Sequence, residues 1–433
     1  MKTNKQNIIL YIISIMFLGF LTNCQKPEFL PEPIGKEVPE KDAPSLTDII
    51  KTEASLFYLA WEKAGMNEIL KSDFPQTQFT YLIPSNEAME KAGYSEMKIK
   101  SMEIEKLQDI IRFHIMDQKI DENSLISDNL DIAFRTILKH NKVYNSKQAY
   151  GSQNVIIPYY YKHYVSFKNK SLIINGKERK YLKQIHSKQG SAWIINNVLE
   201  IFNIQMLDVL KQDKRFSLYV KAIEYSVPNY YREIKRYYIK QFKLPIQFQL
   251  DFFYYFPGFV YESRTTKRDL IYLTLFAPTN EAFNHLGIFN EDDLIKLYNR
   301  VPVPDFYDID ASSPIDSLLV NQNFSKTFDS MFSDNNNSGI KIIGDPGYVH
   351  FSTAFENPNF KKLIISTNRN SPYFNYPNFA FKKMDGKYFV THKNSNVNDA
   401  NIIESDINSL QGPIHVVNRI LVPKGFTMWH LKK

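Results

Sequence analysis

The chain has 433 residues, with 53 Lys and Arg against 46 Asp and Glu and a formal net charge of +7. Over this length that excess is too mild to predict a nucleic-acid-binding protein. Cys24 is the single cysteine, which excludes intramolecular disulfides, zinc–thiolate sites and a cysteine nucleophile from the domains that follow it.

The chain begins with the pattern of an exported protein. Lys2 and Lys5 precede an unbroken apolar run over 8–21, which is typical of a secretory signal. The alternative is an uncleaved anchor helix, but the apolar run is too short to span a bilayer comfortably. We therefore expect a signal peptide over residues 1–23.

The end of this segment indicates lipidation. Residues 21–24 (LTNC) resemble the bacterial lipobox, in which the cysteine receives acyl chains such as palmitate, so Cys24 is the expected lipidation site. Five prolines follow within 25–44, and we expect an extended Pro-rich tether over 24–44. The expected location is the outer membrane, lipid-anchored, at the cell surface.

A short phrase then occurs twice in the chain. Residues 80–89 read TYLIPSNEAM, and residues 274–283, which start 194 positions later (274 − 80), read TLFAPTNEAF. Two further blocks recur in the same order, 55–62 with 217–224 and 190–199 with 412–421. A repeat of this kind predicts two copies of one domain.

The offset between the copies grows from 162 (217 − 55) to 194 and then to 222 (412 − 190), so the second copy carries two insertions. We place the first domain at 45–209 and the second at 210–425, with insertions over about 229–262 and 298–333. Insertions in surface loops cost little closure entropy and commonly carry what distinguishes one copy from the other.

The first block predicts a helix. Phe57, Ala60, Trp61 and Ala64 have the i, i+3, i+4, i+7 spacing of an amphipathic helix, and Gly65 follows as a stop signal. We therefore expect one apolar face of this helix to be buried against its domain.

The other two blocks predict strands. In the second copy we expect a buried strand over 273–277 that ends at Pro278, followed by a helix that Thr279 and Asn280 can cap. The third block predicts a strand over 414–421 that is rich in β-branched residues. The polar residues in these blocks are expected to be caps and turns.

These phrases carry a family resemblance. Residues 276–283 (FAPTNEAF) and 412–418 (GPIHVVN) resemble the two signature boxes of fasciclin-type domains, and 397–407 (VNDANIIESDI) is similar to the segment before the last box. In the first copy, 107–115 (LQDIIRFHI) resembles the family's central helix. The residues that match the family motif are Phe113, His114, Pro278, Thr279, Asn280, Gly412 and His415.

The signature is degraded in the first copy, where Trp193 stands at the position of His415. The second copy lacks a clear counterpart of His114, the nearest candidate segment being 316–323. The resemblance implies an α+β fold of two tandem fasciclin-like domains, each a small twisted β-sandwich or sheet packed with short helices. It also implies a role in adhesion or matrix interaction.

The first insertion is rich in aromatic residues, which predicts one of two roles. Tyr and Arg together are typical of binding hot spots and of platforms that stack on sugars. The alternative is packing against the domain, because several of these residues lie at helical spacing. The candidate binding surface consists of Tyr230, Tyr231, Arg232, Tyr237, Tyr238, Tyr254 and Tyr255.

The segment after the second insertion superficially follows a calcium-binding loop. Residues 334–339 (DNNNSG) and Asp345 supply oxygen ligands and a glycine at the expected positions. Asp345 replaces the usual Glu, however, and 339–343 reads as a strand, which favours a tight hairpin turn. We expect no metal site.

The sequence also lacks a catalytic motif. It contains no Gly-x-Ser-x-Gly elbow, His-Glu-x-x-His helix, phosphate-cradling loop or dinucleotide fingerprint, so we expect neither an enzyme nor a cofactor. His114 and His415 lie among aliphatic residues, as hydrogen-bonded core histidines do. The acidic run 291–293 is expected in the first turn of a helix that Asn290 begins.

Together these patterns predict a non-catalytic, lipid-anchored cell-surface protein for adhesion or binding, with a protein or glycan ligand. The alternative is an accessory glycan-binding lipoprotein of an outer-membrane polysaccharide-uptake complex. An enzyme is the third hypothesis. The expected partners are the membrane, through the lipid anchor, and the ligand, but no nucleic acid.

Overall fold

The computed structural model covers the cores of both predicted domains. The described residues are 43–75, 77–122, 125, 131–149, 155–168, 171–225, 261–262, 268–269, 272–299, 319, 322–324, 340–342, 349–357, 379–392 and 399–422. The signal peptide, Cys24, nearly all of the tether and most of both insertions lie outside the described residues.

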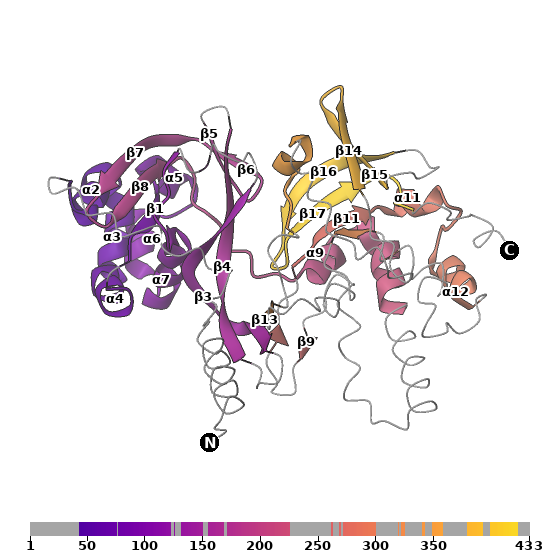
Figure 1. Cartoon of the computed structure of the whole chain (residues 1–433), viewed down its shortest axis with the longest axis horizontal. Helices are drawn as coiled ribbons and strands as arrows, with labels where there is room; N and C mark the ends of the chain where they lie inside the picture. Colours follow the sequence, from indigo (N-terminus) through magenta and orange to yellow (C-terminus); the bar gives the residue numbers. More distant parts are fainter. Residues whose placement is uncertain are drawn as a thin grey trace, which may run out of the picture.

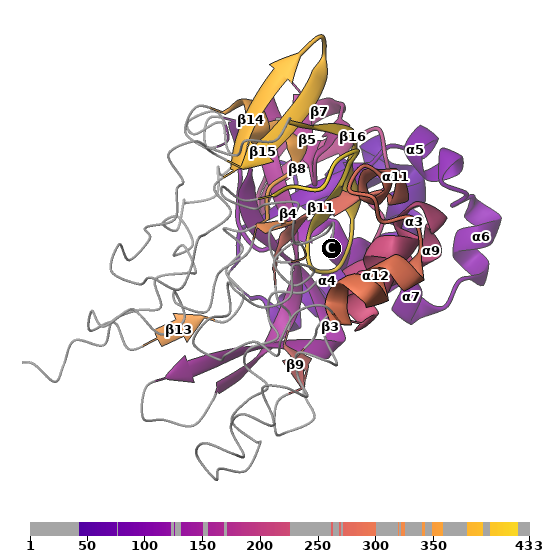
Figure 2. The ribbon, with the colours of Figure 1, turned by 90° about the vertical axis from the view of Figure 1, so that its right-hand side faces the viewer.

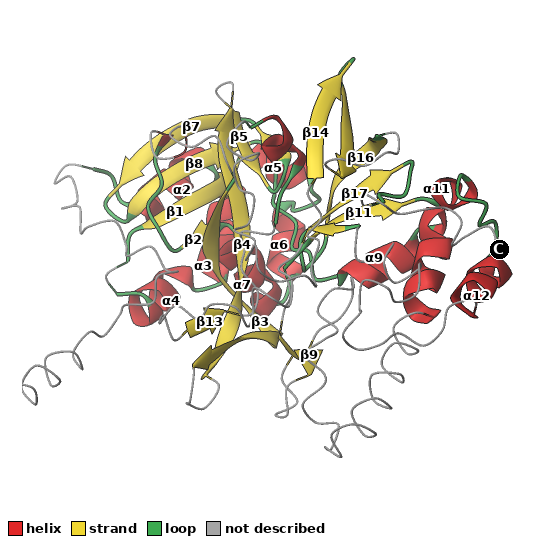
Figure 3. Ribbon diagram, turned by 45° about the vertical axis from the view of Figure 1, so that its right-hand side comes forward, coloured by secondary structure: helices red, strands yellow, loops and turns green. Residues whose placement is uncertain are grey.

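Short helices cover one side of the first domain (Figure 3). Ser45, Ser85 and Ser95 each cap a helix by accepting a hydrogen bond from the backbone N–H three residues ahead. The helices are α2 (Leu46–Glu53), α3 (Ser55–Lys63), α4 (Met66–Asp73), α5 (Asn86–Lys91), α6 (Glu96–Ser101) and α7 (Ile104–Phe113).

Helix α3 confirms the prediction from the first block. Phe57, Ala60, Trp61 and Ala64 are each at most 2% exposed and form one buried face. Gly65 follows with a left-handed backbone (φ 65°, ψ 35°), a conformation that costs glycine little.

The strands of the first domain form one sheet with the order β6-β5-β4-β3-β2-β1-β8-β7. Strands β1 and β8 are parallel and buried along their whole length, as parallel strands between two covering layers usually are. The strands are β1 (Phe79–Pro84), β2 (Ile115–Met116), β3 (Ile132–Ala149), β4 (Val155–Lys168), β5 (Ser171–Ile174), β6 (Lys177–Arg179), β7 (Tyr181–Ser187) and β8 (Gly190–Ile195).

The second domain has its own sheet, with the order β12-β11-β17-β16-β15-β14 (Figure 1). Its strands are β11 (Thr274–Pro278), β12 (Asn323–Phe324), β14 (Phe379–Met384), β15 (Lys387–His392), β16 (Ala400–Asn408) and β17 (Pro413–Val417). Its helices are α9 (Met206–Gln212), η1 (Lys214–Phe216), a helical segment over 217–225, α11 (Asn280–Asn284), α12 (Glu291–Asn299) and η6 (Ser352–Glu356).

The two sheets share a central arrangement. Strand β11 runs parallel to β17 and antiparallel to β12, just as β1 runs parallel to β8 and antiparallel to β2. Gly190 begins β8 and Gly412 immediately precedes β17, and a Cβ atom on Gly190 or Gly412 would lie 1.9 Å or 2.2 Å, respectively, from a carbonyl oxygen of the neighbouring chain segment. The sequence repeat is therefore a structural repeat.

Two predicted elements end earlier than expected. The third-block strand stops at Val417 instead of residue 421, because Asn418 turns to exchange hydrogen bonds with the backbone of Asn401. The helix expected over 107–115 stops at Phe113, because His114 forms its C-cap and Ile115 already belongs to β2.

The long antiparallel ribbon of β3 and β4 was not predicted from the sequence. Its far end reaches toward the second half of the chain, where β3 pairs with β13 (Ile340–Ile342) and with β10 (Arg268–Asp269) (Figures 1 and 2). Strand β10 in turn pairs with β9 (Tyr261–Glu262). Segments from both halves thus join one sheet.

The two domains also share a hydrophobic cluster. Tyr272, Val349, Phe351 and Leu410 of the second half pack into the core of the first domain, and the rings of Phe351 and Tyr164 are 5.6 Å apart. The domains are therefore packed against each other, which the repeat pattern alone does not predict.

Candidate functional site

His114 is a buried structural residue. Its Nδ1 donates a hydrogen bond to the carbonyl oxygen of Ile110 (2.7 Å), and its Nε2 accepts one from the N–H of Leu199 (2.9 Å). This pair of bonds requires the neutral imidazole with its proton on Nδ1. Burial favours the same form and lowers the pKa of His114 to about 4. Both nitrogens are therefore engaged, and the ring ties the end of α7 to the exit of β8.

The counterpart of His114 in the second domain is Gln322. The register of β12 on β11 equals that of β2 on β1, which places the two residues at the same point of the fold. Gln322 Oε1 accepts from the N–H of Leu421 (3.1 Å), and Nε2 donates to the carbonyl oxygen of Leu421 (2.8 Å). Leu421 corresponds to Leu199, because the third block repeats at an offset of 222 residues. The Gln322 amide therefore binds the same backbone position in the second domain that the His114 imidazole binds in the first. Gln322 lies inside the predicted segment 316–323.

His415 is also fully buried and structural. Its Nε2 donates to the carbonyl oxygen of His350 (3.0 Å), its Nδ1 accepts from the N–H of Asp406 (3.4 Å), and its ring stacks on Phe276. Burial lowers the pKa of His415, although the carboxylate of Asp406, 3.9 Å from Nδ1, opposes this shift. The strand register places Trp193 at this position in the first domain, as the sequence alignment predicts.

Thr279 and Asn280 have the structural roles expected of the first signature box. Thr279 caps α11 by accepting from the N–H of Ala282 (3.3 Å), and Pro278 is the last residue of β11. Asn280 accepts from the N–H of Leu218 (2.9 Å) and donates to Ser217 Oγ. In the first domain the residues 194 positions earlier, Ser85 and Asn86, make the corresponding bonds to residues 88, 56 and 55.

Phe113 lies at the centre of a second buried histidine cluster. Its ring is 4.5 Å from that of His163, and His163 Nε2 donates to the carbonyl oxygen of Phe113 (2.7 Å). Asn175 donates to Nδ1 of the same imidazole (3.2 Å), and burial lowers the pKa of His163 to about 3. Sequence analysis missed His163. The dipeptide Asn175-Gly176 is a hairpin-turn signal in the sequence, and Asn175, which has φ 52°, is the residue that hydrogen-bonds His163.

Sequence analysis also missed the polar contacts between the domains. Asp131 of the first domain is partly buried and accepts hydrogen bonds from Ser166 Oγ (2.7 Å) and from Thr353 Oγ1 of the second domain (2.8 Å). Burial raises the pKa of Asp131, and the nearby carboxylate of Asp406 raises it further. Nothing in the sequence around Asp131 indicates this role, because its partners are distant along the chain.

An ion pair continues this contact at the surface. Lys168 Nζ lies 2.9 Å from a carboxylate oxygen of Glu356 in the second domain, and Glu356 also accepts hydrogen bonds from Lys383 and Tyr388. Hydrogen bonds from these cationic and phenolic donors lower the pKa of Glu356 to about 2. Because the group is partly exposed, its contribution to stability is small.

Several predicted sites lie outside the described residues. These are Cys24, the aromatic residues Tyr230, Tyr231, Arg232, Tyr237, Tyr238, Tyr254 and Tyr255, and the loop 334–339 with Asp345. Within the part of the chain that is described, no group of three His, Cys, Asp or Glu side chains could hold a metal ion. The helices of that part are all too short or too polar to cross a membrane.

Comparison with known proteins identifies the first domain. Residues 52–201 match the family model described as the fasciclin domain. No curated protein matches the chain significantly in sequence. One matching solved structure, a FAS1 domain pair from the insect cell adhesion molecule fasciclin I, is 14% identical, with 88% of this chain and 99% of that chain aligned.

The TM-score of that alignment is 0.27, so it carries no argument about how the domains are arranged. The family match and the structural repeat agree on the fold. The chain folds as two tandem fasciclin-like α+β domains, and the family match falls on the copy in which the signature phrase is degraded. The first domain therefore matches the family even though Trp193 stands at the position that His415 occupies in the second copy.

Proposed function

We propose that this chain is a non-catalytic surface protein, lipid-anchored through Cys24, that binds a protein or glycan ligand through the insertions of its second domain. Support comes from the fasciclin fold, which is associated with cell adhesion. A single fold can host many functions, so the residues themselves must indicate which one applies here.

The observation that carries the proposal is the inward direction of the signature residues. His114, His415 and Gln322 are at most 1% exposed, and their polar atoms bind backbone groups of their own domain. With their polar atoms engaged in this way, these side chains offer no free group to abstract a proton from a substrate or to hydrogen-bond a ligand. Recognition must therefore use residues outside the signature boxes, and the insertions are what the second copy adds to the repeat.

The ends of the first insertion support this assignment. The insertion starts after the helical segment 217–225 of the second domain and ends in β9, whose partner β10 is paired with β3 of the first domain. Both ends are thus attached to ordered structure, one on each domain. Fixing the ends of a binding segment reduces the conformational entropy that the segment loses when it binds a ligand. The domain pair therefore restricts the conformations of the insertion before binding.

Location is tested by digesting intact cells with an added protease, with lysed cells as the control. Rapid cleavage on intact cells is expected for a surface protein. Full protection of the chain on intact cells, with cleavage after lysis, would place it in the periplasm and exclude adhesion to a host or matrix.

Ligand binding is tested with the secreted form of the chain that lacks lipid, on glycan arrays and on immobilised matrix proteins. Tyr237→Ala and Tyr255→Ala are expected to reduce binding at least about tenfold while the melting temperature changes little. Variants that lower only the melting temperature would assign these tyrosines to packing instead.

The same experiment addresses the alternative function, capture of glycans for an outer-membrane uptake complex. The high content of Tyr in the insertion favours it, because aromatic rings stack on sugars, and the two Arg residues at 232 and 236 can add hydrogen bonds. Binding to soluble polysaccharide without binding to any matrix protein would support glycan capture. The opposite result would support adhesion.

A further inference from the structure

Two carboxylates from different domains lie close together at the domain contact. Asp131 immediately precedes β3 of the first domain, and Asp406 belongs to β16 of the second. Two consecutive residues of η6 bind them, because the N–H of Ser352 donates to Asp406 (2.8 Å) and Thr353 Oγ1 donates to Asp131 (2.8 Å). Ser166 Oγ donates to Asp131 from the first domain (2.7 Å). The start of one short helix therefore holds both acids, near enough for their charges to repel.

The domain contact also fixes the position of Asp406. This residue is 6% exposed and has a left-handed backbone (φ 62°). The Asn175-Gly176 turn of the first domain covers its carboxylate, since a Cβ atom on Gly176 would lie 2.5 Å from Cγ of Asp406. The Asp406 carboxylate therefore does not reach water, away from Asp131, unless the contact between the domains opens.

No cation among the described residues balances these two charges. His415 Nδ1 is 3.9 Å from Asp406, but this imidazole is neutral, because Nδ1 accepts a backbone N–H and Nε2 donates to a carbonyl oxygen. Lys168 of β4 pairs with Glu356 instead, and Lys177, which follows the turn, is exposed. Two neighbouring carboxylates without a cation bind a proton more readily than either one alone.

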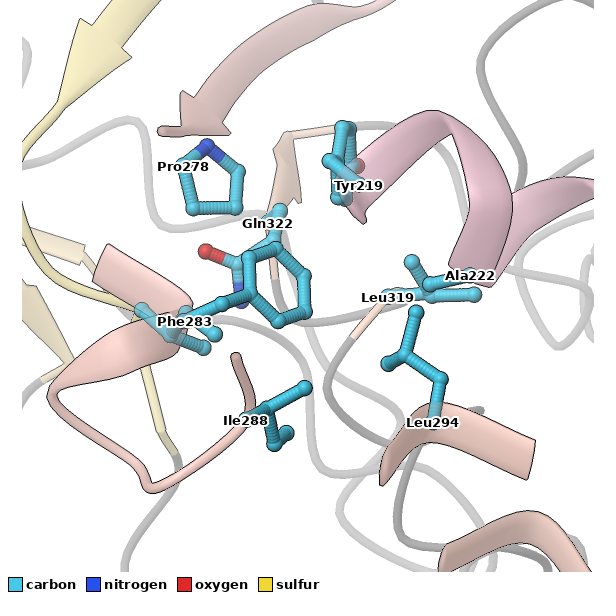
Figure 4. Close-up of a pocket in the computed structure, with 9 residues that line it drawn as sticks. Tyr219, Ala222, Pro278, Phe283, Ile288, Leu294, Leu319 and Gln322 are labelled. Atoms are coloured by element: carbon cyan, nitrogen blue, oxygen red, sulfur yellow. The ribbon is translucent and has the colours of Figure 1, made fainter. Parts of the chain in front are cut away.

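The hollow in the second domain is separate from this pair. Figure 4 shows it between Tyr219, Phe283 and Leu294, and its described lining residues include neither of the two acids nor their hydrogen-bond donors. Its enclosed part is about the size of one water molecule. The protonation of the pair therefore depends on the contact between the domains and not on this hollow.

We propose that Asp131 and Asp406 form a proton-dependent latch, in which one proton on the pair closes the domain contact and its loss at higher pH loosens the contact. Burial and the charge of Asp406 raise the pKa of Asp131, which is the direction that the latch requires. A group whose pKa is raised by folding stabilises the fold below its unfolded pKa, and this stability is lost as the pH rises through the folded pKa. The latch does not depend on the ligand proposed above.

Asp131→Asn is the direct test, because an amide has no charge and can donate a hydrogen bond to Asp406. Calorimetry of the whole secreted chain measures the melting temperature between about pH 5 and about pH 8. At the upper pH the variant is expected to melt about 2–4 °C above the wild type, and this difference should shrink as the pH falls. The histidines are common to both proteins, so their titration cancels. A variant that melts below the wild type at the upper pH would overturn the latch.

Asp406→Asn removes the other charge, and it tests the pair from the second domain even if Asp131→Asn does not fold. The double variant should melt no higher than the better single variant, because one neutral partner already removes the repulsion. Additive gains would overturn the coupling between the two acids. If calcium chloride raises the melting temperature of the wild type but not that of Asp131→Asn, a cation and not a proton balances the pair, and the latch is also overturned.

Asp117→Asn is the matched control within the first domain. Burial raises the pKa of Asp117 as well, but this carboxylate is paired with Arg135. Its neutralisation leaves the guanidinium without a partner, so the melting temperature is expected to fall. A gain equal to that of Asp131→Asn would show a general effect of neutralising buried acids and would overturn the latch.

Discussion

The two domains use different side chains to hold equivalent backbone segments. Where the first domain uses the imidazole of His114 to hold the N–H of residue 199, the second uses the amide of Gln322 to hold both backbone groups of residue 421. Where the first packs Trp193 against β1, the second places His415 against β11. The hydrogen bond to the N–H of residue 199 or 421 is maintained while the residue that makes it changes, whereas the bonds of His415 to His350 and Asp406 are not reproduced by Trp193, whose Nε1 is buried without a partner. In this pair of repeats, backbone groups that need partners constrain the fold more than any particular signature residue does.

The strongest test of the structural equivalence of the two domains is substitution of the glycine at the start of each parallel strand, Gly190 in β8 and Gly412 just before β17. Gly412→Ala and Gly190→Ala would each force a Cβ atom into a carbonyl oxygen, and we expect a loss of about 4 kcal/mol or more in the free energy of unfolding. Chemical denaturation monitored by circular dichroism measures it.

Gly287→Ala and Gly93→Ala are matched controls. Both glycines have positive φ but nothing within 4 Å of the added carbon, so only the backbone strain of about 1 kcal/mol is expected. Similar losses at all four glycines would show that close approach to the neighbouring strand is not what Gly190 and Gly412 provide.

Acid should distinguish His114 from Gln322, its counterpart in the second domain, although buried His415 adds a loss of the same sign in that domain. The pKa of His114 falls from 6.5 to about 4 on folding, so between these pH values the unfolded chain is protonated at His114 and the folded chain is not. The stability from this histidine is complete above pH 6.5 and is lost as the pH falls toward 4, by about 1.4 kcal/mol per pH unit. His163 adds a loss of the same sign. Gln322 does not titrate.

His114→Gln, which copies the second domain, is therefore expected to reduce the loss of stability between pH 6.5 and pH 5 by about 2 kcal/mol. Urea unfolding at both pH values, followed by Trp fluorescence in a Trp429→Phe background, reports on Trp61 and Trp193 of the first domain. The raised pKa of Asp131 acts in the opposite direction but is common to both proteins. An unchanged pH dependence would mean that His114 is not buried as the neutral form.

A third prediction concerns the hydrogen bond between the two domains. Thr353→Val removes the hydroxyl that donates to the partly buried carboxylate of Asp131, and we expect a loss of about 2 kcal/mol. Calorimetry should show a single wild-type transition that broadens or splits in the variant. Thr391→Val, away from this contact, serves as the control and should leave the transition single.

The smallest expected effect concerns the paired asparagines. Asn86→Ala and Asn280→Ala each remove a side chain that joins the start of one helix to the start of another, at an expected cost of about 1 kcal/mol each. Equal losses in chemical denaturation would support equivalent roles. A loss confined to one domain would break the equivalence at this position.

The features that could be predicted from the sequence are local ones. The buried face of α3, the Thr279 cap and the acidic first turn of α12, where Asn290 accepts from the N–H of Asp293, are specified by residues within one or two helical turns. The repeat also predicted the number of domains, because two similar phrases can be recognised in a sequence without knowing which residues are in contact.

What could not be predicted depends on pairs of residues that are far apart in the chain. Gln322 has no motif of its own, and only strand register identifies it as the partner of Leu421. Asp131 finds two of its hydrogen-bond donors, Thr353 and the backbone of Phe351, in the other domain, and Thr353 is 222 residues away in the chain. The ribbon of β3 and β4 carries no pattern that separates a long hairpin from two short strands.

That ribbon has a consequence for how the chain is made. The edge of β3 at residues 147–149 pairs with residues 340–342, about 190 positions later (340 − 149), so this edge has no partner until much of the second half of the chain has been made. During synthesis, an unpaired strand edge is a template for pairing with another chain. The second domain therefore also protects the first from self-association, and the first domain produced alone is expected to form dimers or aggregates through this edge.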